Sequence, residues 1–128
     1  MTTRVPPQLI DQSNGIGYTP GAGGSVTQAT SKTTTITLNK PCGRITLAAS
    51  SLAAGAVATF LFNNSTAGDG DVLVVSAHEY GGSNENHLFS TMTRNGGGAF
   101  FVTVRNMSAS PVAEAVVINF AIVKATAA

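Results

Sequence analysis

Two histidines and two glutamates stand close together in the chain, and their chemistry is the first question that the sequence raises. His78 and Glu79 follow one apolar run, and Glu85 and His87 come just before the next. The end of one strand and the start of the following strand can converge, so these side chains could surround a metal ion. Their spacing matches none of the patterns typical of zinc sites, however. We therefore expect ordinary polar residues at the edges of a loop, with no metal and no cofactor bound.

Asp69 and Asp71 flank Gly70 and could contribute two carboxylates to a calcium loop. The segment lacks the further oxygen ligands and the distal glutamate of an EF-hand. As the acid pair of a glycosidase, the two aspartates have no aromatic residue beside them that would suggest a sugar-binding platform. We therefore predict a turn, in which Asp and Gly serve the backbone geometry.

Other motifs that carry chemistry are incomplete. No Gly-x-Ser-x-Gly nucleophile elbow occurs, and the glycine runs at 21–24 and 96–98 lack the Gly-Lys-Ser/Thr ending of a phosphate-binding loop. The triplets at 64–66 and 106–108 fit the N-glycosylation pattern, but no secretory signal opens the chain, so we expect no sugar there. The sequence therefore favours a protein that is not an enzyme and binds no small-molecule substrate.

Charged residues are scarce, at 10% of the 128 residues, and the formal net charge is only +1. Binding to nucleic acid needs a clustered basic field, and because no such cluster exists here we expect no nucleic-acid partner. A surface solvated mainly by Thr, Ser, Asn and Gly suits a protein that is packed against other proteins. We interpret the basic residues as solvated or interface charges: Arg4, Lys32, Lys40, Arg44, Arg94, Arg105 and Lys124.

The longest apolar stretch, 113–123, is interrupted by Glu114 and Asn119 and is too short to span a bilayer, so no membrane association is expected. We predict a protein that is made in, and soluble in, a cytoplasm. Cys42 is the only cysteine, which excludes an intramolecular disulfide. A chain of this length forms one domain with a core of Val, Ile, Leu, Ala and a few Phe residues, without metals or disulfides.

From Ser25 onward, short β-type runs alternate with turn residues, as expected of a sandwich or barrel. The turn at 95–98, with the sequence Asn-Gly-Gly-Gly, is the strongest hairpin signal. The segment 72–77 is apolar on both faces and predicts a central strand covered on both sides, and 52–55 is interpreted as a bulged connection or at most one helical turn. We predict an all-β domain over residues 25–128, an eight-stranded antiparallel jelly roll or related Greek-key sandwich. Its strands are expected at 25–28, 33–39, 44–48, 57–63, 72–77, 88–93, 99–104 and 116–123.

The period of two also predicts which side chains of this sandwich point inward. Along 57–63, for example, Phe60 and Phe62 share one face while Val57, Thr59 and Leu61 share the other. The residues expected to be mostly buried are Ile36, Leu38, Ile45, Phe60, Phe62, Val74, Val102, Val104, Ile118 and Phe120.

Residues 1–24 are predicted to be an extended arm, because their proline and glycine content favours neither helix nor strand. A purely flexible tail would rarely carry several sizeable apolar groups. We therefore predict that the arm orders on a partner, the alternative being that it folds onto its own domain. The candidate partner-contacting residues are Val5, Leu9, Ile10, Ile16 and Tyr18.

The chain resembles a family of small proteins encoded among the structural genes of tailed phages and prophages. The resemblance covers roughly residues 15–125 and is densest at both ends. It is carried by the segments 15–18, 21–24, 26–32, 37–40, Gly43, 45–46, 52–55, 105–106, 108–109, 114–121 and 124–125.

The family is similar to the jelly-roll cement, or decoration, proteins on the outside of phage heads. The resemblance implies a structural virion protein on the outer capsid surface, made in the cytoplasm of a bacterial host. Its implied partners are the major capsid protein, whose contacts it reinforces, and a second copy of itself in a homodimer. The alternative function is a tail-associated or receptor-binding β-sandwich module.

Overall fold

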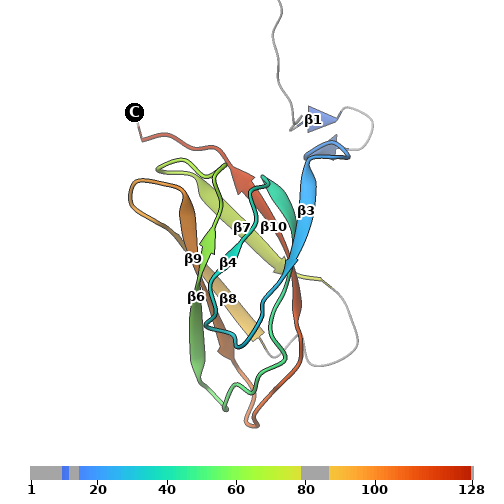
Figure 1. Cartoon of the computed structure of the whole chain (residues 1–128), viewed down its shortest axis with the longest axis vertical. Helices are drawn as coiled ribbons and strands as arrows, with labels where there is room; N and C mark the ends of the chain where they lie inside the picture. Colours follow the sequence, from blue (N-terminus) through green and yellow to red (C-terminus); the bar gives the residue numbers. More distant parts are fainter. Residues whose placement is uncertain (1–9, 12–14, 79–86, 128) are drawn as a thin grey trace, which may run out of the picture.

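Branched and aromatic side chains alternate with small polar ones along most of the chain, and this pattern gives strands with one apolar side. The computed structural model describes residues 10–11, 15–78 and 87–127, and within these ranges it contains strands and no helix. The body consists of eight strands, the number that the sequence predicts (Figure 1). They are β3 (Gly23–Thr27), β4 (Ile36–Thr37), β5 (Cys42–Thr46), β6 (Val57–Asn63), β7 (Val72–Ala77), β8 (His87–Thr93), β9 (Ala99–Asn106) and β10 (Val117–Val123).

The eight strands form two four-stranded sheets around one core (Figure 1). The strand order is β3-β5-β10-β7 in one sheet and β4-β6-β9-β8 in the other. Buried side chains from both sheets belong to a single hydrophobic cluster, and the rings of Phe62 and Phe120 meet across it edge to face at 4.9 Å. The prediction of an all-β, two-layered sandwich is therefore confirmed. No helix that could cross a membrane occurs in the part of the chain that the structure describes.

The prediction that all strands pair in antiparallel fashion is wrong. Residues 23–27 of β3 lie parallel to 42–46 of β5, and residues 36–37 of β4 lie parallel to 62–63 of β6. The reason is that the chain crosses to the opposite sheet after each strand from β3 to β7. Each crossing reverses the chain, so after two crossings a strand re-enters its sheet in the direction of the earlier one. Of the eight strands, only β8 and β9 are consecutive and paired, across the predicted hairpin turn.

The predicted core is largely confirmed. Eight of the ten residues expected to point inward are buried, and Leu38 is partly buried and packs against the core. Val74 is the exception, because 51% of its surface is exposed.

The exposure of Val74 corrects the prediction for β7. Instead of a central strand covered on both faces, β7 is an outer strand of its sheet, paired to β10 alone among the described strands. Leu73 points into the core, whereas Val72 and Val74 point out of the sheet and are exposed. The strand is apolar on both faces, but none of the described residues covers Val72 and Val74 on the outer face.

The outer edge of β7 lies beside β8 of the opposite sheet. The Thr91 hydroxyl donates a hydrogen bond to the Leu73 carbonyl at 2.9 Å, and the Thr93 hydroxyl donates to the Asp71 carbonyl. Unpaired carbonyls on an outer strand are the usual template for edge-to-edge association. Here the two threonines satisfy the carbonyls of Asp71 and Leu73, so side chains of the same chain cover this part of the edge.

The N-terminal segment contains more regular structure than the sequence predicts. The short strands β1 (Ile10–Asp11) and β2 (Gly15–Ile16) pair antiparallel and lie beyond the upper end of β3 (Figure 1). β3 itself begins at Gly23, inside the range predicted as an arm. Its pairing with β5 needs glycine at position 43, where φ is 151° and an added Cβ would lie 2.0 Å from the Gly24 carbonyl oxygen.

Candidate functional site

The acidic residues weighed as calcium ligands or catalytic groups are engaged in a turn, as predicted. Asp71 is buried, and its Oδ2 accepts hydrogen bonds from the Gly68 amide and from the Lys124 ammonium, each at 2.7 Å. Burial raises the pKa of Asp71, but the bonds from Lys124 and Gly68 outweigh it and hold the pKa below 3.8. Asp69 accepts a bond from the Gly96 amide at 3.1 Å, which links this turn to the β8–β9 hairpin.

The two histidines considered for metal binding stand on either side of the segment that connects β7 to β8. His78 directly follows β7, and His87 is buried at the start of β8, with its ring stacked on Phe89. Glu79 and Glu85 lie outside the described residues. Among the residues that are described, no group of three or more His, Cys, Asp or Glu side chains is arranged to hold a metal ion.

The two asparagines in glycosylation-type triplets are fully buried and act as locks on the loops that follow them. Asn64 donates to the Lys40 carbonyl at 2.7 Å, and its Oδ1 accepts from the Thr66 amide and hydroxyl. Asn106 is held in the same way: its Oδ1 accepts from the amide and hydroxyl of Ser108. The Ser or Thr two residues later therefore serves a local turn. The Asn106 amide group also donates to the carbonyls of Leu52, Ala53 and Ser110.

Lys32 corrects the prediction that the basic residues are solvated or interface charges, because it is only 2% exposed. Its ammonium donates to the backbone carbonyls of Ala48, Ser50 and Glu114 at 2.7, 2.7 and 3.1 Å. An ammonium has three N–H donors, so each has an acceptor in place of water. Burial lowers the pKa of Lys32, and the charge of the Glu114 carboxylate opposes that shift.

Sequence reasoning had no signal for this site. The three acceptors are backbone carbonyls, which every residue possesses, and they come from two separate loops of the chain. A single lysine among threonines therefore looks like a surface residue until the fold is known.

Tyr18, one of the predicted partner-contacting residues, binds its own domain. Its hydroxyl donates to the Ile122 carbonyl at 2.5 Å. Because Cys42 pairs with Ala121, Pro41 stands opposite Ile122 in the β5–β10 ladder. The Ile122 amide donates to the Pro41 carbonyl at 2.8 Å, but proline has no N–H to return the bond. The Tyr18 hydroxyl supplies the missing donor and fixes the root of the arm.

Of the other four candidate partner-contacting residues of the arm, the structure describes Ile10 and Ile16. Val5 and Leu9 lie outside the described residues, and Ile10 is placed only by its backbone pairing with Ile16. Ile16 is 82% exposed. Among the described residues of the arm, Ile16 thus presents a large apolar side chain to solvent, and the prediction that the arm contacts a neighbouring subunit remains a prediction.

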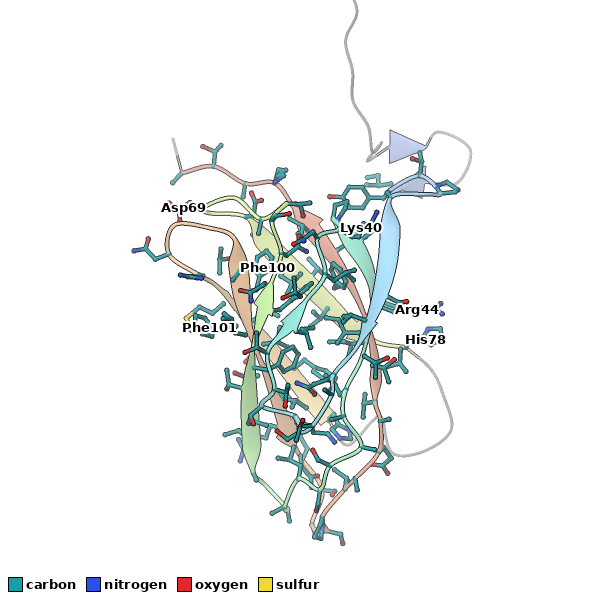
Figure 2. The ribbon with its side chains drawn as sticks, in the orientation of Figure 1. Lys40, Arg44, Asp69, His78, Phe100 and Phe101 are labelled. Carbon is teal, nitrogen blue, oxygen red and sulfur yellow. The ribbon has the colours of Figure 1, made fainter. Side chains whose placement is uncertain are left out.

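The outer face of the β6-β9-β8 layer carries the largest exposed apolar side chains of the sandwich. We call this surface the Arg105 face. Met92, at 63% exposure, is the most exposed of them. On β9 the alternation is visible in Figure 2, where Phe100 lies in the core and Phe101 points away from it. The strand register arranges the face in three rows: Val57-Arg105-Leu88, Thr59-Thr103-Ser90 and Leu61-Phe101-Met92.

The outer face of the opposite sheet is also partly apolar, but its side chains are smaller. We call it the Val74 face. Val72 lies beside Val123, and Val74 lies beside Ala121. Arg44 also lies on the Val74 face, and its guanidinium Nε donates a hydrogen bond to Asn119 Oδ1 at 3.2 Å.

No family model, no curated protein and no solved structure matches this chain. What the protein does must therefore be inferred from its surfaces and from the resemblance of its sequence segments.

Proposed function

We propose that this chain is a structural virion protein, a cement or decoration protein that binds the outer surface of a tailed-phage head. It reinforces contacts between subunits of the major capsid protein. The observation that carries the proposal is the pair of outer sheet faces, each bearing apolar side chains that are 42–63% exposed: Val57, Leu88 and Met92 on one face, and Val72, Val74 and Val123 on the other. Exposed apolar clusters of this kind mark surfaces that other proteins cover.

The residues that resemble chemical motifs support the same conclusion in a second way. The carboxylate of Asp71, the amides of Asn64 and Asn106 and the ammonium of Lys32 are all engaged in hydrogen bonds that fix loops. Each of these groups therefore contributes to a rigid scaffold, as a protein that stiffens an assembly requires.

The proposal extends to the finer fold class. Jelly rolls are two-layered sandwiches whose strands are distributed between two sheets, and here each step from β3 to β8 leads into the opposite sheet. The two parallel pairs depart from the fully antiparallel arrangement of a jelly roll. We therefore propose a relative of the jelly roll with a rearranged strand order.

A homodimer on the particle is part of the proposal. Because threonine hydroxyls already occupy the Asp71 and Leu73 carbonyls on the β7 edge, we expect such a dimer to form through a sheet face or the arm and not through that edge.

Copy number tests the proposal directly. Purified virions are separated into heads and tails, and the chain is quantified by mass spectrometry against the major capsid protein and a tail subunit. A head-bound copy number comparable with that of the capsid protein is expected. A copy number comparable with that of tail subunits, in the tail fraction, would instead identify a tail-associated or receptor-binding module.

A further inference from the structure

We infer that the Arg105 face docks onto an apolar protein surface that carries carboxylates. The identity of the partner as the capsid surface rests on the proposed function, whereas the chemistry of the partner rests on the face itself. Three features of the Arg105 face support this inference: the shape of the face, its amino-acid composition and the lack of a described carboxylate beside its arginines.

The shape of the face is set by the strands beneath it. Two apolar rows, one containing Val57 and Leu88 and the other Leu61 and Met92, lie on either side of a hydroxyl row. Within the hydroxyl row, Thr59 and Thr103 bond to each other at 2.8 Å. Because these two hydroxyls bond to each other, a docking surface that covers this part of the face leaves fewer polar groups unsatisfied.

The composition of the face resembles that of protein interfaces. Aromatic residues, Met and Arg are enriched where proteins bind one another, whereas Lys, Glu and Asp are depleted. The face carries Phe101, Met92 and Arg105, and Arg94 follows directly after β8. The strands β6, β8 and β9 contain no acidic residue and no lysine.

The charge of the face is uncompensated within the described residues. Among the described residues, the one ion pair joins Lys124 to Asp71 and involves neither arginine. The guanidinium groups of Arg94 and Arg105 form no hydrogen bond with another described side chain. A carboxylate is the group that a guanidinium binds best, through two parallel hydrogen bonds. A partner with carboxylates placed against these arginines therefore complements the face.

A second copy of the chain is a poor match for the same surface. Two Arg105 faces would bring guanidinium groups together, and the strands β6, β8 and β9 of neither copy contain a carboxylate to pair with them. The area is also small: three strands about 4.8 Å apart, with a rise of about 3.4 Å per residue, give roughly 350 Å² per side. A stable dimer buries at least about 1,200 Å² in total. The same area limits contact with any partner, so the Arg105 face can supply only part of a stable interface.

The test measures binding of purified protein to heads and, separately, to tails by co-sedimentation over a range of salt concentrations. Arg105→Glu and Met92→Thr change the Arg105 face, and Arg44→Glu and Val74→Thr are matched controls on the Val74 face. We expect each face variant to weaken head binding about tenfold or more at low salt, and wild-type binding to weaken as salt increases. Thermal unfolding checks that each variant is folded, and Arg94→Glu replaces any that is not.

The outcomes separate this inference from the proposed function. If wild-type protein binds tails instead of heads and the face variants lose that binding, the decoration function is wrong and the inference holds. If the face variants bind as wild type does, or the controls lose as much, the inference is wrong. It is also wrong if the protein sediments as a dimer that Arg105→Glu converts to monomers, because the occupant is then a second copy. Failure to bind either heads or tails overturns both proposals.

Discussion

At each end of the sandwich, a buried asparagine and a lysine ammonium form hydrogen bonds with the loops, but the two lysines differ in how far they are exposed. At the end where β6 finishes, Asn64 locks its loop and Lys124 bonds to Asp71, with 68% of the Lys124 side chain exposed. At the opposite end, Asn106 locks its loop and Lys32 is enclosed by three carbonyls. We refer to these as the Asn64 end and the Asn106 end.

The difference shows what burial demands of a charge. An exposed ammonium keeps most of its water, so its ion pair adds little to the free energy of unfolding. A buried ammonium has lost its water, and its bonds to protein oxygens must replace it. We therefore expect the Asn106 end to depend far more on its lysine than the Asn64 end does.

The largest effect is expected from Lys32→Met. The substitution leaves three carbonyls without their donor in a water-poor site, which should cost about 3–5 kcal/mol of unfolding free energy. Urea denaturation followed by circular dichroism measures it. Lys124→Met is the matched control at the other end. Equal losses of unfolding free energy from the two substitutions would show that burial of the ammonium does not set its contribution to stability.

The next effects are expected from the asparagines. Asn106→Ala should cost about 2–4 kcal/mol and Asn64→Ala about 1–3 kcal/mol, because the Asn106 amide serves more carbonyls than that of Asn64. Denaturation midpoints of the two variants, measured side by side, test the order. A larger loss at Asn64 would show that hydrogen-bond number does not set the stability of the two loops.

Tyr18→Phe should have a smaller effect, about 1–2 kcal/mol, because it removes one hydrogen bond to the Ile122 carbonyl and keeps the ring. Its main consequence should be local. Amide hydrogen exchange at Thr19, Gly21 and Ala22, near the root of the arm, should accelerate, while exchange at the Asn106 end stays unchanged. Unchanged exchange near the arm would show that Tyr18 does not anchor it.

The smallest effect is expected from Lys124→Met, at most about 1 kcal/mol near neutral pH. Because the pKa of Asp71 is held below 3.8 in the folded protein, its carboxylate stabilises the fold above that pH and the contribution is lost as the pH falls through the lowered pKa. Wild type and variant should therefore converge in stability at acid pH. A difference that persists there would place the role of Lys124 in packing instead of charge.

The strands, the hairpin and most inward-facing residues could be predicted because each depends on local pattern. The β6 alternation, for instance, needs only seven consecutive residues. The sheet order could not be predicted, since nothing in β3 or β5 specifies that the intervening strand crosses to the other layer. The hydrogen bonds of Lys32 and Tyr18 could not be predicted for the same reason: their acceptors include backbone carbonyls distant in the chain, 82 residues away for Glu114 and 104 for Ile122.

The strand order also bears on how fast the chain folds. β10 lies between β5 and β7, although it follows every other strand in sequence. Until β10 arrives, β5 and β7 have no ladder joining them, and the sheet that contains them is split in two. The β8–β9 hairpin is the only part of the body that can pair without distant residues. Folding should therefore be slow, because it is completed by the insertion of one central strand.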